Sequence, residues 1–358
     1  MTNNLDVNKI TQLTPESINR CIFIGAPGIG KTEELRRYAE KIAKEKGRKF
    51  VDLRVEKDID DVEHNYYYLR IIAPHVFPED LSIPNKTENG IILTSPKIID
   101  ILTRENAEGL VFIDEINNVQ RSDQRVIFYA LIQEGEIGWG TKLNDKIVIV
   151  AAGNTPEWSS DAVSLPNPLI NRMVKISVEP PSIKSWINYM DTHHPTYDRR
   201  TAAFLSSFPS YFIKRPEEED LANFPTPRSW TNLAVRLNKE MSNELVYSIV
   251  EGTIGSEAST YFLEFIKTQV PSFEEIIANP LLFKRLNISQ QMMLIYEMAQ
   301  RYIEFKEIGG EKVIDEWRNS NRDSILLLIS LVPKNKRVEY FGVEFFNEFA
   351  LELAAYVH

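Results

Sequence analysis

A glycine-rich segment at residues 25–32 constrains the fold more than any other part of the chain. It matches the pattern G-x-x-x-x-G-K-[ST], follows an apolar run at 21–24 and precedes an amphipathic segment that reaches Gly47. The apolar run predicts a buried strand, and the apolar spacing after the glycines predicts a helix that ends at Gly47. A strand, a glycine-rich loop and a helix in this order can place backbone amides around phosphate oxygens. A chance glycine-rich turn is the alternative, and the agreement between motif and setting favours phosphate binding.

The residues of this loop predict how nucleotide phosphates and Mg²⁺ are held. The glycines let backbone N–H groups turn inward, and the helix N-terminus adds a partial positive charge. Lys31 is expected to reach the β- and γ-phosphates, and the Thr32 hydroxyl is expected to ligate Mg²⁺. The predicted nucleotide-binding residues of this segment are Gly25, Ala26, Pro27, Gly28, Ile29, Gly30, Lys31, Thr32 and Glu33.

A second apolar run, at 110–113, ends in Asp114 and Glu115. Such a run is typical of a buried parallel strand, and ligands gather at the carboxyl ends of these strands. Asp114 is predicted to hold Mg²⁺ through its carboxylate, by way of a water molecule, and Glu115 to polarise the attacking water as general base. Many strands end in acidic residues, but the position about eighty residues after a phosphate loop makes this pattern specific.

Three further apolar runs, at 49–55, 146–152 and 174–178, predict additional strands. The second of them ends at Gly153 and Asn154. A polar side chain at the tip of a core strand can orient the attacking water, whereas a turn-forming Gly-Asn pair is the alternative. Together the five runs predict a parallel five-stranded sheet with helices on both faces, an α/β fold of the αβα sandwich type.

Residues 56–109 carry a mixed pattern. Acidic residues at 56–63 are followed by Tyr66, Tyr67 and Tyr68, and prolines interrupt the remainder. One interpretation of the tyrosines is a surface that grips a partner. The other, which is the commoner outcome for such clusters, is an insertion that packs on its own domain.

From residue 182 onward the pattern is helical. Thr226 is predicted to cap one of these helices, and Pro227 fits its first position. Arg228 then falls in the first turn, where a cation opposes the helix dipole. This placement indicates an anionic partner such as a nucleotide phosphate, and an ordinary surface arginine is the alternative.

The composition limits the classes of protein that fit the chain. A net charge of −10 argues against a large nucleic-acid-binding surface. Cys21 is the only cysteine, so no internal disulfide can form, and its place in a strand predicts a buried, inert thiol. No secretory signal is recognisable, and no apolar run is long enough to span a bilayer. We therefore expect a cytoplasmic protein without a membrane span.

Several motifs together resemble an AAA+ ATPase, and within that class the MoxR-like branch. The matching stretches are residues 25–32, 110–115, 151–154, 168–172 and 226–228. A sub-branch is still more similar, because it shares Val-Asp-Leu-Arg, Asp-Glu-Ile-Asn, Phe-Pro-Thr-Pro-Arg-Ser-Trp and Glu-Gly-Thr-x-Gly, here at 51–54, 114–117, 224–230 and 251–255. The resemblance covers about residues 14–285.

The resemblance implies an AAA+ P-loop ATPase core at 1–181 and a helical lid at 182–285, followed by a helical C-terminal segment at 286–358 that matches no motif. It makes Asn154 the sensor 1 residue and Arg228 the sensor 2 arginine. It makes Arg172 an arginine finger that reaches the nucleotide of a neighbouring subunit. A local ion pair is the alternative for Arg172, and Arg121 or Arg125 could serve as the finger instead. The expected catalytic residues are thus Lys31, Glu115, Asn154 and Arg172, with Thr32 and Asp114 at the metal.

The same resemblance implies a function. We expect ATP and Mg²⁺ as cofactors and a homo-oligomeric ring, a hexamer, that couples ATP hydrolysis to chaperone-like remodelling or maturation of a protein partner. A protein with a von Willebrand factor A domain is one candidate partner. The rival readings are a nucleic-acid motor or loader, which the acidic residues at 56–63 weigh against, and an ATP-binding regulatory switch without turnover, which the set of Glu115, Asn154 and Arg172 disfavours.

Overall fold

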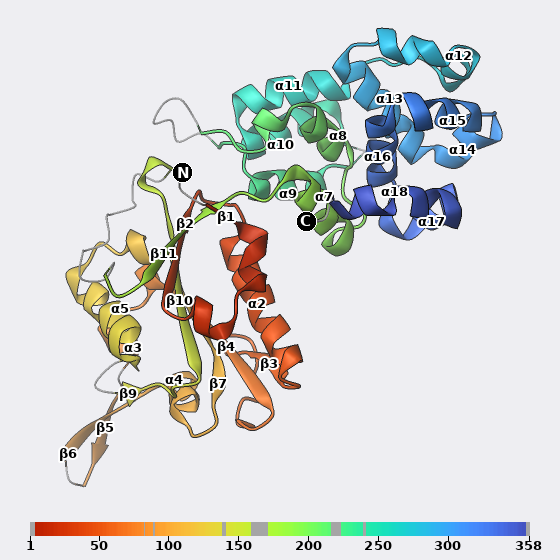
Figure 1. Cartoon of the computed structure of the whole chain (residues 1–358). Coiled ribbons are helices and arrows are strands. Elements are labelled where there is room, and N and C mark those ends of the chain that lie inside the picture. The colour runs from red at the N-terminus through yellow and green to blue at the C-terminus, as the bar shows by residue number, and fades with distance from the viewer. Residues whose placement is uncertain are drawn as a thin grey trace. The chain divides into compact units, whose positions relative to one another are not determined.

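The computed structural model describes residues 4–81, 83–88, 90–137, 141–158, 171–215, 223–238 and 241–355. The chain forms two compact units, Met1–Pro180 (unit 1) and Pro181–His358 (unit 2). Unit 1 contains the strands, and unit 2 is helical (Figure 1). Across the described parts of both units, no helix is both long enough and apolar enough to cross a membrane.

Unit 1 is built on a seven-stranded sheet in which every neighbouring pair of strands is parallel. In spatial order the strands are β1 (Leu5–Asp6), β11 (Val174–Glu179), β2 (Cys21–Gly25), β10 (Ile147–Asn154), β7 (Glu108–Asp114), β4 (Asn65–Ile72) and β3 (Lys49–Asp52). The expected αβα class is confirmed, but the sheet has seven strands where five were expected. Cys21 is buried, as predicted, and burial raises the pKa of its thiol.

Helices cover both faces of this sheet. Helix α2 lies on one face, and α3 and α5 lie on the other (Figure 1). The helices of unit 1 are α1 (Pro15–Ile18), α2 (Lys31–Glu45), α3 (Pro78–Leu81), α4 (Lys97–Asp100) and α5 (Ser122–Glu134). Its short 3₁₀ turns are η1 (Val7–Gln12), η2 (Ala73–His75), η3 (Ile101–Thr103), η4 (Ile116–Asn118) and η5 (Pro156–Trp158).

Two antiparallel hairpins complete unit 1. One pairs β5 (Ile83–Thr87) with β6 (Gly90–Thr94), and the other pairs β8 (Glu136–Ile137) with β9 (Thr141–Lys142). The first hairpin projects from the body of the unit (Figure 1). The second follows α5 in the chain.

The tyrosine cluster at 66–68 is not part of an insertion. It forms β4, which lies inside the sheet between β3 and β7. All three tyrosines are buried, and Tyr67 donates a hydrogen bond from its hydroxyl to the carbonyl oxygen of Ile59 at 2.6 Å. The cluster therefore packs within its own domain, and it adds a strand that the sequence pattern did not reveal.

Unit 2 is all helical in its described residues. Its helices are α7 (Ile183–His193), α8 (Arg200–Ser207), α9 (Pro227–Arg236), α10 (Asn243–Ile254), α11 (Ser256–Ile266), α12 (Phe273–Ala278), α13 (Ile288–Gln300), α14 (Tyr302–Glu307), α15 (Glu311–Ser320), α16 (Arg322–Leu331), α17 (Arg337–Phe341) and α18 (Val343–Ala355), with 3₁₀ turns η6 (Pro209–Tyr211), η7 (Pro280–Arg285) and η8 (Lys334–Lys336). One hydrophobic core runs from Trp186 to Leu353. A boundary at residue 285 stays a prediction, and helices on both sides of it contribute to this core.

A buried charge cluster joins the two ends of unit 2. Asp191 in α7 forms ion pairs with Arg199, at 2.7 Å, and with Arg337 of α17. The Arg199 guanidinium also lies 4.6 Å from the ring centroid of Tyr197. Burial lowers the pKa of Arg337, which the nearby Asp191 charge opposes. Helix α17 is thus tied to α7, the first helix of the unit.

Candidate functional site

The glycine-rich loop connects β2 with α2, as the sequence predicts. Gly28 (φ 73°) and Gly30 (φ 102°) adopt the left-handed conformation that favours glycine. Helix α2 begins at Lys31, so its N-terminal amides and partial positive charge lie at the loop. Strand β2 has β11 and β10 on its two sides, and the loop therefore opens at the carboxyl end of the middle of the sheet. Ligands of parallel sheets bind at this edge.

Lys31 brings the loop and strand β10 together. Its ammonium donates hydrogen bonds to the carbonyl oxygens of Gly25 (3.0 Å) and Ala26 (2.9 Å) and to Oδ1 of Asn154 (3.2 Å). The side chain is largely buried, so the charge is held inside the loop. Two residues that lie 123 positions apart in the sequence, and that were predicted to share a site, are therefore in contact.

Thr32 and Asp114 form the oxygen-rich part of the site. The Thr32 hydroxyl donates to Oδ2 of Asp114 at 3.0 Å. A hydroxyl and a carboxylate are hard oxygen donors of the kind that Mg²⁺ prefers, so this pair fits the expected metal. Within the described residues, no group of three or more His, Cys, Asp or Glu side chains could hold a metal. Mg²⁺ bound by Thr32 and Asp114 would thus draw its other ligands from water and phosphate, as is common for this ion.

Glu115 follows β7 in a strained backbone conformation. Its φ of 56° and ψ of 35° lie in the left-handed region, which costs a non-glycine residue roughly 1–2 kcal/mol. Its N–H donates to Oδ1 of Asp114 at 3.0 Å. Strained residues of this kind cluster at functional sites, where the surrounding structure holds them in place. The backbone conformation of this turn therefore sets the direction of the Glu115 side chain.

Asn117 is a residue of the site to which the sequence assigned no role. Its amide group donates to the carbonyl oxygen of Asn154 at 2.6 Å, and its Oδ1 accepts from the N–H of Asn154 at 3.0 Å. Residue 153 must be glycine beside it, because a Cβ there would lie 2.6 Å from Asn117 Oδ1. The only sequence signal was the place of Asn117 in the Asp-Glu-Ile-Asn turn.

Arg70 is a second residue that the sequence did not reveal. Its Nε and Nη2 donate to Oδ2 of Asp114 at 3.0 and 2.6 Å. Arg70 lies in β4, and β4 pairs with β7 so that Ile72 is opposite Asp114. Recognising residues 65–72 as a strand parallel to β7 would have placed Arg70 near the site.

Arg172 is not brought to the loop within unit 1. It lies in an exposed turn just before β11, and β11 pairs with β2 so that Val174 is opposite Cys21. Since the loop follows the other end of β2, Arg172 is at the opposite edge of the sheet. The preceding residues 168–170 of this motif lie outside the described residues.

The two alternative finger residues have partners in their own chain. Arg121 pairs with Asp123 at 2.5 Å. Arg125 donates to the carbonyl oxygens of Val119 (2.8 Å) and Gln120 (3.0 Å). Both guanidinium groups are therefore engaged locally in this structure.

Arg228 lies in unit 2, in the first turn of α9, and is exposed. Thr226 and Ser229 form a reciprocal capping box at the start of this helix, with Pro227 at the first helical position. The expected cap is thus confirmed. Glu33, the last residue of the predicted nucleotide-binding segment, is exposed in the first turn of α2.

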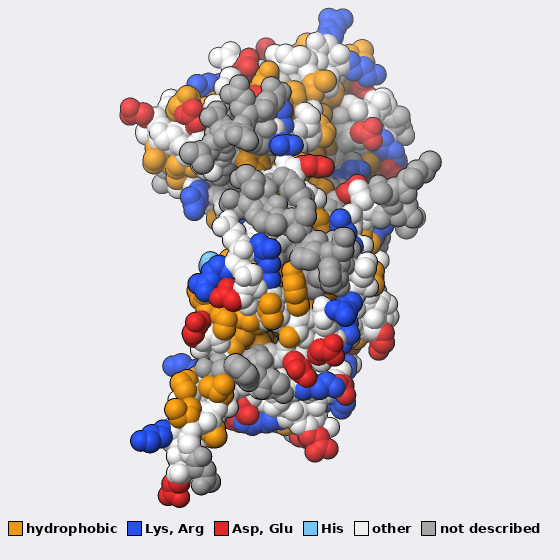
Figure 2. Space-filling view, turned by 90° about the vertical axis from the view of Figure 1, so that its left-hand side faces the viewer, with side chains coloured by type: hydrophobic (Ala, Val, Ile, Leu, Met, Phe, Trp, Pro, Cys, Tyr) orange, Lys and Arg blue, Asp and Glu red, His pale blue; other side chains and the backbone are white. Residues whose placement is uncertain are grey.

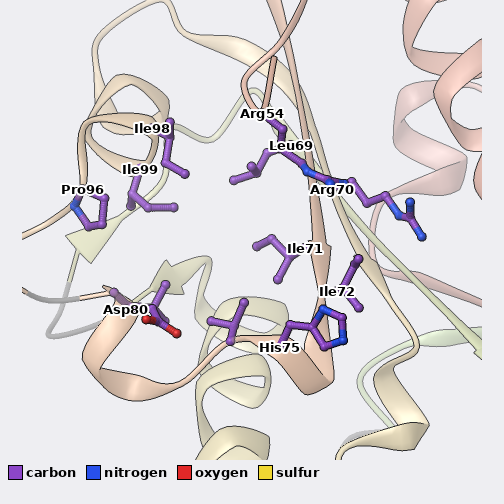
Figure 3. A pocket seen from close by; sticks show the side chains of 12 residues that line it. Arg54, Leu69, Arg70, Ile71, Ile72, His75, Asp80, Pro96, Ile98 and Ile99 are labelled. Atoms are coloured by element: carbon purple, nitrogen blue, oxygen red, sulfur yellow. The ribbon is translucent and has the colours of Figure 1, made fainter. Parts of the chain in front are cut away.

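A pocket of about 300 Å³ lies beside the site, at the end of β4. Leu69 and Ile71 of β4 point into it, and α3 and α4 contribute Leu81 and Ile99. The Arg70 side chain points away from these residues, to the other face of β4 (Figure 3). The apolar part of the pocket and the Asp114 site are therefore on opposite faces of one strand.

The projecting hairpin exposes apolar side chains. Ile91 is 74% exposed, and Ile83, Ile92 and Leu93 are each about half exposed. Figure 2 shows hydrophobic side chains gathered along the hairpin and on the adjoining surface. Exposed apolar patches of this kind mark interaction surfaces in soluble proteins.

Comparison with known proteins finds a family whose sequence model matches part of this chain. Residues 21–179 match the sequence model of the ATPase family associated with various cellular activities (AAA). No curated protein matches the chain. Among solved structures, NtrX from Brucella abortus is similar at 12% identity and a TM-score of 0.37, covering 98% of this chain and 66% of NtrX. PCH-2 from C. elegans is similar at 14% identity and a TM-score of 0.31, covering 72% of this chain and 66% of PCH-2.

The chain thus spans about two thirds of the length of these two proteins. Because these TM-scores are low, the similarity to the family rests on the sequence match and on the geometry of the site. That match begins at β2 and ends at β11, and it includes the glycine-rich loop, Asp114, Glu115 and Asn154. Residues 21–179 are therefore similar in sequence to the AAA ATPase family, and unit 1 has the P-loop nucleotide-binding fold.

Proposed function

We propose that this protein is a Mg²⁺-dependent ATPase that works as a ring of identical subunits and remodels a protein partner. The observation that carries the proposal is the meeting of Lys31, Thr32, Asp114 and Asn154 at the carboxyl ends of three adjacent strands. Each of these side chains supplies a group that phosphoryl transfer to water requires.

The roles follow from the positions of the groups. Lys31 exchanges its bonds with the loop carbonyls for bonds with the β- and γ-phosphate oxygens. Mg²⁺, when bound through Thr32 and Asp114, neutralises phosphate charge as the leaving group departs. Glu115, directed by its left-handed turn, accepts a proton from the attacking water. Asn154, fixed by Asn117 at its backbone, orients that water from the end of β10.

The position of Arg172 supports an oligomeric enzyme. An exposed arginine at the opposite edge of the sheet cannot serve its own loop, but it is free to enter the site of an adjacent subunit. A guanidinium supplied in this way stabilises the charge of the transition state. The MoxR-like resemblance supports a hexameric ring, in which Arg228 of the helical unit senses the nucleotide.

A protein is the partner that the surface favours. The net charge of −10 disfavours nucleic acid, and the exposed apolar side chains of the β5–β6 hairpin suit a protein surface. By the same resemblance, we propose a chaperone-like role in the cytoplasm, with a von Willebrand factor A domain protein as one candidate substrate.

Phosphate release by the full chain tests the enzymatic part of the proposal. The wild-type protein should hydrolyse ATP, Glu115→Gln should bind ATP without turnover, and Lys31→Ala should lose binding. ATP binding by the wild type without phosphate release that depends on Glu115 would indicate a regulatory switch instead. Hydrolysis that DNA stimulates, and that weakens steeply with salt, would indicate a nucleic-acid motor. Affinity capture with Glu115→Gln then identifies the partner.

A further inference from the structure

Both oxygens of the Asp114 carboxylate accept hydrogen bonds from protein groups. Its Oδ2 accepts from the Thr32 hydroxyl (3.0 Å) and from Nε and Nη2 of Arg70 (3.0 and 2.6 Å). Its Oδ1 accepts from the N–H of Glu115 at 3.0 Å. Only 9% of the Asp114 side chain is exposed, so a lone negative charge here would be costly. Arg70 supplies the compensating charge.

Arg70 holds the carboxylate that Mg²⁺ would use in the proposed site. Oδ2 is the Asp114 atom in contact with Thr32, the other metal ligand of the proposed site. Two cations close to one oxygen repel each other, and the repulsion grows in a partly buried site. The Arg70 side chain is 29% exposed, so it has a route to leave this position. It projects to the face of β4 opposite Leu69 and Ile71 (Figure 3).

We propose that Arg70 is a positioning residue that holds Asp114 before nucleotide binds and gives up Oδ2 when Mg²⁺ arrives with the nucleotide. The inference rests on the proposed function, because it requires a Mg²⁺–nucleotide complex at this loop. It has two consequences. Arg70 raises the concentration of Mg²⁺ that the site needs, and it protects the fold from an unpaired buried carboxylate while the site is empty.

A purely structural ion pair behaves differently, and the same strand offers one for comparison. Arg48 pairs at 3.3 Å with Glu108, which starts β7 as Asp114 ends it. Their side chains are 15% and 11% exposed, against 29% and 9% for Arg70 and Asp114. Glu108 also pairs with Lys46 at 2.6 Å and with Lys146 at 3.5 Å. Because the Glu108 pair is at the other end of the strand from the loop, Mg²⁺ and nucleotide should not affect it.

The test measures binding and unfolding, not turnover. Full-length wild type, Arg70→Gln, Arg70→Lys and Arg48→Gln are titrated with Mg²⁺ in the presence of a fluorescent ATP analogue. Their thermal unfolding is compared in EDTA and in saturating Mg²⁺ and ATP. Arg70→Gln should lower the half-saturating Mg²⁺ concentration about tenfold, the effect of removing one charged hydrogen-bond donor. It should also unfold at a lower temperature than wild type in EDTA, and this deficit should shrink with Mg²⁺ and ATP.

Arg48→Gln and Arg70→Lys distinguish a positioning role of Arg70 from a purely structural one. Arg48→Gln should show the same deficit in both conditions and an unchanged Mg²⁺ requirement. Arg70→Lys, which keeps the charge but not the two-donor geometry, should lie between wild type and Arg70→Gln, and it decides the matter if Arg70→Gln does not fold. An unchanged Mg²⁺ requirement in the Arg70 variants, or a deficit that Mg²⁺ and ATP leave intact, overturns the inference. If the wild-type protein binds no ATP analogue, the proposed function is wrong, and this inference, which depends on it, is wrong as well.

Discussion

Asn117 and Asn154 exchange two hydrogen bonds that join the turn after β7 to the end of β10. The amide of Asn117 donates to the Asn154 carbonyl at 2.6 Å and accepts from the Asn154 N–H at 3.0 Å. Asn117 follows Glu115 by two residues, so one short segment carries the proposed base and fixes the backbone of the proposed water-orienting residue. The relative position of Glu115 and Asn154 therefore depends on this contact.

Removing the Asn117 side chain should impair chemistry more than nucleotide binding. Asn117→Ala leaves the Asn154 backbone without its two partners, and small displacements of catalytic groups lower turnover by about 10- to 100-fold. The affinity for ATP should change by less than about threefold, because the loop and Lys31 are untouched. Steady-state phosphate release and equilibrium ATP binding measure the two effects.

Asn19 provides a matched control for that variant. Its Oδ1 accepts from the N–H of Ile149, on the same strand β10 but away from the site. Asn19→Ala should lower the free energy of unfolding by about 1 kcal/mol, while turnover per folded molecule stays unchanged. Equal loss of turnover in the two variants would show that Asn117 acts only through stability.

Gly153 should tolerate no side chain while Asn117 is present. An alanine Cβ would lie 2.6 Å from Asn117 Oδ1, so Gly153→Ala should lower the free energy of unfolding by about 1–3 kcal/mol. The double variant with Asn117→Ala should recover part of this loss, because the clashing atom is gone. Gly252→Ala, in a helix with open space around it, should instead stabilise by about 0.5–1 kcal/mol. Additive losses in the double variant would contradict the packing argument.

Arg172 should act on the neighbouring subunit. Arg172→Ala and Lys31→Ala should each be inactive alone, since one lacks the finger and the other lacks the phosphate-binding ammonium. Mixing them should restore some phosphate release, because some interfaces then contain an intact loop and an intact arginine from different chains. Full turnover by Arg172→Ala alone would rule the assignment out, and Arg121 and Arg125 would be examined next.

The pairing of Glu108 should make stability depend on pH in the acid range. Burial tends to raise the pKa of Glu108, but Lys46 (2.6 Å), Arg48 and Lys146 outweigh it, so the pKa lies below its usual value. The ionised carboxylate therefore stabilises the fold above the unfolded-state pKa, and this stability is lost as the pH falls through the lower folded-state pKa.

Glu108→Gln should thus lower the free energy of unfolding by about 1–3 kcal/mol near pH 7, and the difference from wild type should fade toward about pH 3. Urea unfolding at a series of pH values measures this. Glu40→Gln, which breaks an exposed pair with Arg36, should change stability by less than about 0.5 kcal/mol at any of these pH values. A Glu108 effect that is constant with pH would mean that the charge is not responsible.

The phosphate loop and the Asp114 strand could be predicted from the sequence because their signals are local. Glycine spacing, a lysine and a hydroxyl within eight residues report a backbone conformation directly, and an apolar run that ends in acids reports a buried strand. The capping box at Thr226 is equally local, since Thr226, Pro227 and Ser229 are neighbours in sequence.

Strand β4 and the contacts of Asn117 and Arg70 could not be predicted in this way. Three consecutive tyrosines followed by Leu69 and Arg70 have neither the alternation of a half-buried strand nor the uninterrupted aliphatic run of a buried one. The bonds of Asn117 join residues 37 positions apart, and those of Arg70 join residues 44 positions apart. Such pairs are set by strand order and register, which a single sequence leaves open.

The ion pairs of Asp191 make the last helices part of the fold that begins at Ile183. A chain that ended after residue 285 would keep Asp191 and Arg199 but lose Arg337, and it would uncover the apolar core that α13 and α16 complete. In evolutionary terms, residues 286–358 are therefore expected to pass between related proteins only together with the rest of unit 2. Recombination that replaced them would have to restore both a cation at Asp191 and a matching apolar surface, so unit 2 is expected to be inherited whole.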